Sequence, residues 1–516
     1  MKGWKMAENG SGEKNSFLSK ILGIYVLLIG LGFPIVFRNR YFDMLSTKYF
    51  FYWICTLLLI VLSFAYFIFK GFSVKDIVKK MTVADYSILI FLLVAAISTF
   101  TSSYLYESFW GNEGRYTGLF LLSLYVLSYF LVSRFWIYRS FYIDGMLLVG
   151  MFVCLFGITD YFQMDIFRFR VDVVVEQKNI FTSTIGNINT YTAYVGMVMA
   201  MSSVLFSVSN GKKKFYYYFC MVISFFAIIM GVSDNAYISL AALFGFLPLY
   251  LFSNKNGIRR YLVVLATFLS VVKIISWINV YFKDIVLGID SVFNIIADSG
   301  ALLYLIVGLW GLAGLWYVLK HKSCLESETR ECGKRFQYMW LILIALMVLL
   351  VIYVLYDCNV SGNIQRYGSL GNYLIFNDEW GTHRGYIWRN AMERFSEFSP
   401  WKKLVGYGPE TFKMLLMHKT YNNPYNETFD AAHNEYLQFL LTTGIIGLVS
   451  YVTFLLSYIK RCFSCRNKNP YMIAMAFAVT CYSTQALVNL NVPTVTPFFW
   501  LLLGMSSALS MESVVN

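Results

Sequence analysis

Residues Asp430 to Gly447, DAAHNEYLQFLLTTGIIG, join a polar segment to an apolar helix, and the rest of the chain is organised around this junction. The helix is expected to continue without charge to about Ile459, which is long enough to cross a bilayer. Asp430 is expected to cap it, so that His433 falls in its first turn, at the boundary between water and lipid. A helix N-terminus favours a neutral imidazole and attracts anions such as phosphate, whereas Asp430 and Glu435 act in the opposite direction. The sequence therefore leaves the direction of any pKa shift at His433 open.

The composition predicts a membrane protein. Of the 516 residues, 58% are hydrophobic and only 14% are charged, whereas soluble domains carry about a quarter charged residues. The formal net charge of +13 is not read as a nucleic-acid signal, because the basic residues alternate from loop to loop as an orientation signal does. No internal repeat is evident. The predicted fold is an all-α polytopic transmembrane bundle, a single membrane domain over residues 1–516.

About fourteen spans are predicted from the apolar runs. Their approximate ranges are 21–37, 50–69, 86–104, 119–137, 142–160, 189–208, 216–233, 237–253, 261–282, 300–319, 338–356, 436–459, 471–490 and 496–512. The basic loops fall on one side if both termini lie in the cytoplasm, with the loops at 70–85, 209–215 and 320–337 inside. The first span is interpreted as a retained helix, since no cleavage pattern follows it.

This orientation places one long segment, residues 357–435, outside the cytoplasm. It is expected to be ordered, because Trp388, Met392 and Phe395 recur along one face of a helix that begins near Gly385. Pro400 is expected to end that helix, and residues 405–409 to form a tight turn. An amphipathic helix at the bilayer surface is predicted, with three arginines on or near its polar flank: Arg384, Arg389 and Arg394. The alternative is a solvated basic helix without a role.

Several motifs on this outer face resemble those of one enzyme family. His433-Asn434, nine residues, Gly444, two residues and Gly447 resemble the signature of the O-antigen ligase and O-antigen polymerase superfamily, the Wzy-C domain. Further motifs agree with it: Thr382-His383-Arg384-Gly385 with Trp388, Gly406-Tyr407-Gly408 with Phe412, Gly114-Arg115-Tyr116-Thr117-Gly118, and Gly186-Asn187-Ile188-Asn189. The resemblance is dense over residues 380–450 and thin elsewhere.

The resemblance implies a GT-C-like, metal-independent integral-membrane glycosyltransferase. Such an enzyme takes a glycan from an undecaprenyl-diphosphate carrier and joins it to an acceptor hydroxyl at the outer face of the bacterial cytoplasmic membrane. It implies that a histidine acts on the acceptor and that arginines hold the diphosphate. The expected partners are the lipid-linked glycan, a glycan, lipid or protein acceptor, membrane lipids and polysaccharide-assembly proteins, but no nucleic acid.

The chemistry of the residues themselves agrees with this implication. Transfer from a diphosphate requires an anion-binding group, which guanidinium supplies, and a base for the incoming hydroxyl, which imidazole supplies. His433 and Arg384 are the predicted catalytic residues. The predicted residues for binding the diphosphate or glycan are Arg115, Arg366, Arg389, Asn434, Glu435, Asn187 and Asn189. No metal site and no other cofactor is predicted.

One departure from the family pattern leaves the phosphate site open. Family members often carry a Ser-Arg pair where this chain has Ser233-Asp234-Asn235. Either another arginine, Arg115 or Arg366, supplies the charge, or the site differs in detail.

Three alternatives remain beside the enzyme. A transporter or flippase for lipid-linked sugars is the first, although transporters tend to show paired halves and broken helices at the midplane. A non-catalytic scaffold is the second, and a purely structural interfacial His433 is the third. Within the enzyme interpretation the motifs do not separate a polymerase, which is favoured weakly, from a ligase.

Overall fold

The computed structural model describes residues 17–70, 81–112, 114–289, 292–322, 333–466 and 469–515. Among these residues nearly all regular structure is helical, and the strands are two-residue β1 (Phe181–Thr182) and β2 (Gly186–Asn187), which pair antiparallel. The predicted all-α polytopic fold is confirmed. Parts of the predicted inner loops, residues 71–80 and 323–332, and the N-terminal segment 1–16 lie outside the described residues.

Within the described residues, eleven helical stretches are long and apolar enough to cross a membrane. They are α1–α2 (Phe17–Ile35, which includes the π-helical turn Leu28–Gly32), α3 (Met44–Lys70), α5 (Val83–Phe100), α8 (Ser140–Tyr161), α9 (Ile188–Val208), α10 (Lys213–Met230), α12 (Lys255–Tyr281), α14 (Ala301–Lys322), α15 (Arg335–Asn359), α20 (Glu435–Ser464) and α21 (Pro470–Gln485) with the 3-10 turn Ala486–Val488.

The other three predicted spans are helices too, but they do not belong to this set. Two of them, α7 (Leu119–Phe135) and α11 (Asn235–Leu251), have 17 residues each, and the third is α22 (Thr496–Val515). All three lie inside the bundle: α7 packs on α22, and α11 packs on α9 and α21. A helix surrounded by protein does not need the full apolar length that lipid demands. The shorter lengths of α7 and α11 therefore account for two of the three helices by which the predicted count of about fourteen exceeds eleven.

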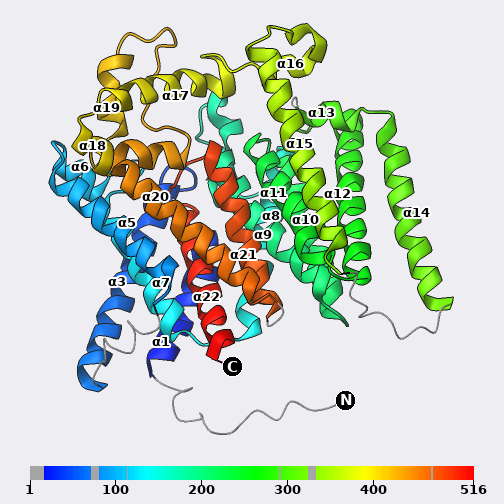
Figure 1. Cartoon of the computed structure of the whole chain (residues 1–516), viewed down its shortest axis with the longest axis horizontal. Coiled ribbons are helices and arrows are strands. Elements are labelled where there is room, and N and C mark those ends of the chain that lie inside the picture. The colour runs from blue at the N-terminus through cyan, green and yellow to red at the C-terminus, as the bar shows by residue number, and fades with distance from the viewer. Residues whose placement is uncertain are drawn as a thin grey trace.

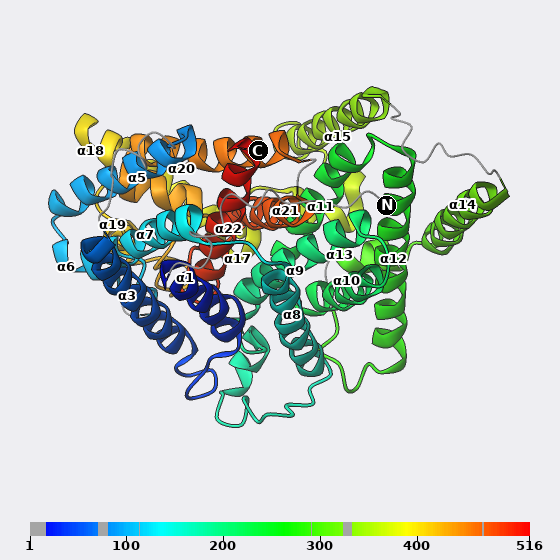
Figure 2. The same ribbon diagram turned by 90° about the horizontal axis from the view of Figure 1, so that it is seen from below.

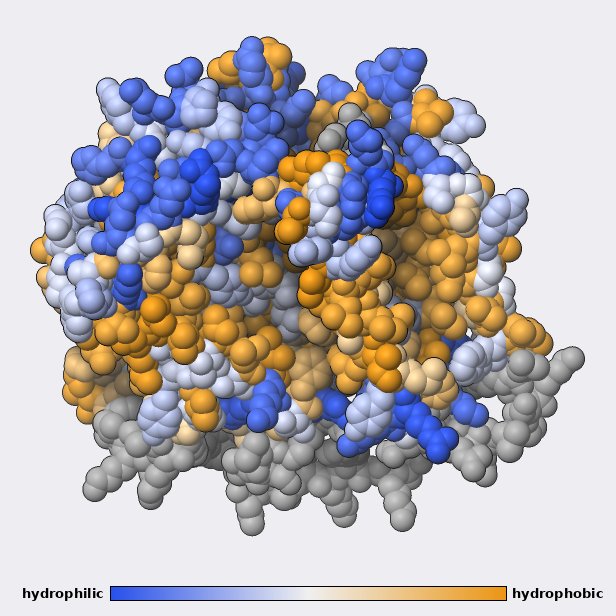
Figure 3. Space-filling model, turned by 45° about the horizontal axis from the view of Figure 1, so that its top comes forward, coloured by the Kyte–Doolittle hydropathy of each residue, from blue (hydrophilic) through white to orange (hydrophobic). Residues whose placement is uncertain are grey.

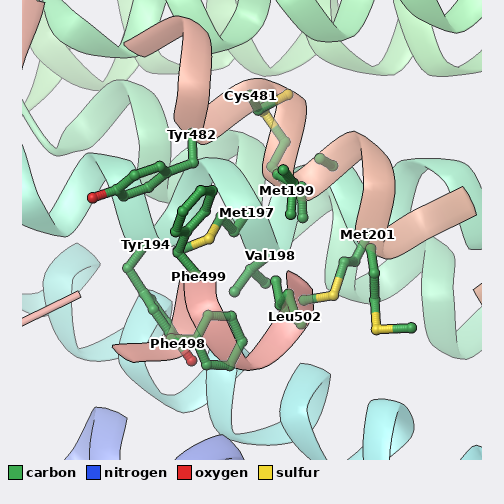
Figure 4. Packing of buried hydrophobic residues seen from close by; sticks show 14 of the residues in the cluster. Tyr194, Met197, Val198, Met199, Met201, Cys481, Tyr482, Phe498, Phe499 and Leu502 are labelled. Atoms are coloured by element: carbon green, nitrogen blue, oxygen red, sulfur yellow. The ribbon is translucent and has the colours of Figure 1, made fainter. Parts of the chain in front are cut away.

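The centre of the bundle is α9, which is buried along almost its whole length. It packs against α21 and α10, and Figure 4 shows Tyr194 and Met197 of α9 among Tyr482 of α21 and Phe499 of α22. By contrast α14 and α15 expose apolar side chains on nearly every face, and α14 stands at the edge of the molecule in Figures 1 and 2. Such helices are suited to contact with lipid. Figure 3 shows the resulting apolar belt between two polar zones.

A layer of short elements covers one end of the bundle (Figure 1). Its helices are α6 (Leu105–Trp110), α13 (Val292–Ala297), α16 (Gly371–Leu374), α17 (Trp380–Ser396), α18 (Pro400–Val405) and α19 (Phe412–Thr420), with 3-10 turns at Val175–Ile180 and Ile364–Leu370. Pro400 was predicted to end α17, but α17 already ends at Ser396, and Pro400 is the first residue of α18, after the Ser399 cap. Proline suits the first helical position, because the N–H it lacks would have no partner there.

Two glycines from the family-like motifs, Gly444 and Gly406, let this layer dock on α20. Gly444 kinks α20 with φ +68°, and a Cβ there would collide with the Leu404 carbonyl. Gly406 has φ +77°, and a Cβ on it would collide with the Thr442 backbone. The Gly408 N–H then donates to the Thr442 carbonyl over 2.9 Å. Only glycine adopts these backbone angles without strain, so the spacing of the glycines fixes the outer layer above the start of α20.

Candidate active site

His433 precedes α20 instead of lying in its first turn. The helix begins at Glu435, and its N-cap is Asn434, whose side chain accepts hydrogen bonds from the N–H groups of Tyr436 and Leu437, each at 3.0 Å. The prediction that Asp430 caps the helix is therefore wrong. Asparagine is as good a cap as aspartate and stands nearer to the first helical turn. His433 itself has φ +48°, in the left-handed region.

Asp430 instead holds an arginine beside His433. It accepts a two-pronged pair from Arg115, with Nε–Oδ2 at 3.0 Å and Nη2–Oδ1 at 2.7 Å. Burial alone would raise the pKa of Asp430, but the hydrogen bonds and charge of Arg115 lower it below its usual range. The pair is about half exposed on the side of Asp430. Arg115 is therefore fixed in position while its guanidinium keeps further N–H groups for an anion.

Glu410, which was not predicted from the sequence, holds the loop that carries Arg115 through two hydrogen bonds. Glu410, only 6% exposed, accepts a short hydrogen bond from the Thr117 hydroxyl, and its backbone carbonyl accepts one from the Asn112 amide at 2.6 Å. Burial raises the pKa of Glu410, and the nearby Arg115 charge opposes that rise. No motif marks Glu410 in the sequence, because its partners lie about three hundred residues away along the chain.

Arg384 approaches the same region from α17. The backbone of Gly381, Thr382 and His383 is left-handed, so regular helical geometry begins at Arg384. Its Nη1 donates to Asn235 Oδ1 over 3.3 Å. Burial lowers the pKa of Arg384 from its ordinary value, and the Asp234 carboxylate partly offsets this. Arg384 thus reaches the position at which the family pattern often has its own arginine.

His433, Arg115 and Arg384 interact electrostatically. Burial first, and then the positive charges of Arg115 and Arg384, lower the pKa of His433 to about 4, against a smaller opposing effect of Asp430. In the part of the chain that is described, the imidazole has no hydrogen-bond partner. Just before it, the Ala432 carbonyl accepts from the Trp388 indole at 2.8 Å, which ties this segment to α17. A neutral imidazole with free nitrogens therefore lies within the electrostatic influence of two cations.

Of the remaining predicted residues, Asn189 contacts the segment that carries Asp234, whose charge acts on Arg384. Its Oδ1 accepts from the Ser233 hydroxyl at 2.7 Å, one residue before Asp234. Asn187 caps α9 by accepting from the Asn189 N–H at 2.8 Å. The Asn187 side chain therefore stabilises the N-terminus of α9.

Glu435 and Asn434 adjoin His433 but have protein partners of their own. Glu435 is 1% exposed and accepts from the Tyr451 hydroxyl at 2.8 Å. It lines a small pocket of about 20 Å³ together with Arg115 and Gln438. Asn434 serves as the cap described above. Both residues therefore stabilise the start of α20 next to His433.

Two predicted arginines are not brought to His433. Arg366, 65% exposed, pairs with Asp357 at 3.5 Å at the outer end of α15. Arg389 pairs with Asp378 at 2.7 Å on the outer flank of α17. Between the two arginines that could replace the family's Ser-Arg pair, the structure thus brings Arg115 to the site, and not Arg366.

The histidines outside the site do not form a metal centre with it. His383 stacks on Tyr425 with ring centroids 3.7 Å apart, and its Nδ1 lies 3.2 Å from Glu427. No cluster of three or more His, Cys, Asp or Glu side chains that could hold a metal ion occurs in the described ranges.

Comparison with known proteins identifies the same region. Residues 285–452 match the family model described as O-antigen ligase, Wzy_C. The matched part runs from just after α12 to the middle of α20 and contains Arg384 and His433 but not Arg115. A search of curated proteins found no match.

Proposed function

We propose that this chain, a member of the O-antigen ligase and polymerase superfamily through its Wzy-C domain, transfers a glycan from a polyprenyl-diphosphate carrier to an acceptor hydroxyl. The proposed carrier is undecaprenyl diphosphate, and the proposed site lies at the outer ends of the helices. The transfer is proposed to need no metal ion. The product would be a surface polysaccharide that is either lengthened or attached to its final acceptor.

The observation that carries this proposal is the convergence on His433 of two cations from distant segments. Arg115 comes from the loop before α7, Arg384 comes from α17, and both charges act on His433. A structural interfacial histidine would not need Arg384 beside it, because Arg384 is partly buried and its hydrogen-bond partner is the neutral Asn235 amide, and burying positive charge with incomplete compensation is costly. A diphosphate would supply further negative charge to Arg384 and to the N–H groups of Arg115 that Asp430 does not use.

In the proposed reaction, a nitrogen of His433 accepts the proton of the acceptor hydroxyl as its oxygen attacks the anomeric carbon of the donor glycan. The bond between that carbon and the diphosphate oxygen breaks, and its electron pair remains on the diphosphate. Arg384 and Arg115 stabilise the charge that develops on the leaving group, which is the usual role of preorganised donors. The imidazolium then releases its proton to solvent, and the low pKa of His433 favours that release.

The pH dependence of transfer tests this assignment. His433 must be neutral to accept a proton, so activity should fall as the pH falls through its pKa. For the free enzyme, kcat/KM for the lipid-linked donor should lose half its value only near pH 4, the pKa set by burial and by Arg115 and Arg384. The acid limb of kcat should lie at higher pH, because bound diphosphate offsets both arginines and moves the pKa of His433 back toward its ordinary value.

Initial rates of the purified full chain across about pH 3 to 8 provide the measurement, with monodispersity checked at each pH. An acid limb at the same pH in both parameters would contradict the proposal, since donor binding would then not act on the base.

The orientation of the chain is also a proposal, based on the alternation of basic loops. In a cysteine-free background, a cysteine placed at Lys419 in α19 should react with an impermeant maleimide added outside intact cells. A cysteine placed at Gly211, between α9 and α10, should react only after the cells are opened. The reverse labelling pattern would put His433 in the cytoplasm and would refute an outer-face reaction.

A further inference from the structure

A groove opens on the outer surface beside the candidate active site. It has a volume of about 500 Å³ and lies between the segment before α17, one flank of α17 and the first turn of α20. Its wall includes Phe376, Asp378, Trp388, Arg389, Met392 and Asn434. Because Asn434 directly follows His433, the groove reaches the residue next to the proposed base.

One wall of the groove is aromatic and held rigidly. The ring centroids of Phe376 and Trp388 are 6.1 Å apart, and Trp380 contacts both at 5.4 Å. The hydrogen bond from the Trp388 indole to Ala432 fixes the orientation of that ring. Phe376 nevertheless remains 52% exposed and Met392 49% exposed. Fixed apolar faces are therefore open to the groove.

The same groove carries planar polar groups. Asp378 and Arg389 form a two-pronged pair, with oxygen–nitrogen distances of 3.0 and 2.7 Å. The Arg389 charge and hydrogen bonds lower the pKa of Asp378 below its usual range. The carboxylate is therefore ionised, and its oxygens have lone pairs beyond those that Arg389 uses. An apolar floor beside a few oriented polar groups is the usual form of a small-molecule site.

We propose that this groove binds a sugar ring of the acceptor glycan. A saturated sugar ring has C–H faces that fit an aromatic wall and hydroxyls that donate to a carboxylate such as Asp378. This inference rests on the proposed function. The acceptor is chosen over the donor because Arg384 reaches toward Asn235 on α11, whereas the groove lies along Phe376, Asp378 and Asn434. A glycan seated there presents a hydroxyl toward His433 while the diphosphate occupies the arginines.

The test measures binding of two probes to the purified full chain in lipid nanodiscs by titration calorimetry. The first probe is oligosaccharide released by mild acid from the surface polysaccharide of the producing strain, and the second is inorganic diphosphate. Phe376→Ala should weaken oligosaccharide binding about five- to tenfold, which corresponds to the loss of one aromatic contact. Asp378→Asn should weaken it as well. Neither variant should change diphosphate binding.

Trp401→Ala is the matched control. Trp401 is as exposed as Phe376, 52% in each case, but it lies on α18 and does not line the groove. Unchanged oligosaccharide affinity in Phe376→Ala would overturn the inference, as would an equal loss in Trp401→Ala, which would mark both rings as membrane-interface anchors. The proposed function fails separately, if the unaltered chain does not bind diphosphate.

Discussion

His433→Ala is expected to abolish detectable glycan transfer, because loss of a positioned general base costs about 10²–10⁴-fold in rate. The binding of inorganic diphosphate should persist, since the two arginines remain. The low pKa of His433, about 4, means that the imidazole is neutral and able to accept a proton throughout the neutral range. Transfer is measured with the lipid-linked donor and the acceptor, in excess chelator because we propose a metal-independent reaction.

His418→Ala is the control for this variant. His418 belongs to the same outer layer but is exposed at the last turn of α19, so its removal should leave the rate unchanged. The two variants should be compared at equal amounts of monodisperse protein. If His433→Ala transfers glycan at a rate near that of the unaltered chain, His433 is only a structural residue and the proposed mechanism is wrong.

The helical bundle was predictable because lipid imposes a simple pattern on the sequence. Each predicted span coincides with a helix, since a run of apolar residues in lipid must satisfy its own backbone hydrogen bonds. The helices α7 and α11 fell short of the expected span length because neighbouring helices surround them, and hydropathy alone does not report what a helix packs against. The same limit applies to α9, whose burial on all sides has no distinct signature in its sequence.

The candidate site was predictable only in part. The family motifs indicated His433, Arg384 and Arg115, and the structure brings these three together. The motifs did not reveal that Asp430 would pair with Arg115 instead of capping α20, since Asp430 and Asn434 are both good caps. They also did not indicate Glu410. Contacts between residues some three hundred positions apart follow from the docking of the outer layer, which no local pattern records.

Arg384→Ala is expected to cause the largest loss of donor binding among the arginine variants, and Arg384→Lys an intermediate loss. Lysine keeps the positive charge but replaces a planar fork with a single ammonium group, so it cannot bind two phosphate oxygens in parallel. Removing a hydrogen-bonded partner of a charge typically costs about 2–5 kcal/mol, or roughly 30- to several-thousand-fold in affinity. Diphosphate titration of the purified chain measures the effect on binding, and initial rates measure the effect on transfer.

Arg366→Ala is the matched control, because Arg366 also belongs to the layer of short elements over the bundle but pairs with Asp357 at the end of α15. It should bind diphosphate as the unaltered chain does. Arg384→Ala should also move the acid limb of kcat/KM to higher pH, because it removes one of the two cations that lower the pKa of His433. A loss of diphosphate affinity without that upward shift would separate Arg384 from His433 and would refute a shared site. An upward shift of the acid limb without a loss of diphosphate affinity would mean that Arg115, and not Arg384, binds the diphosphate. It would refute the role proposed for Arg384.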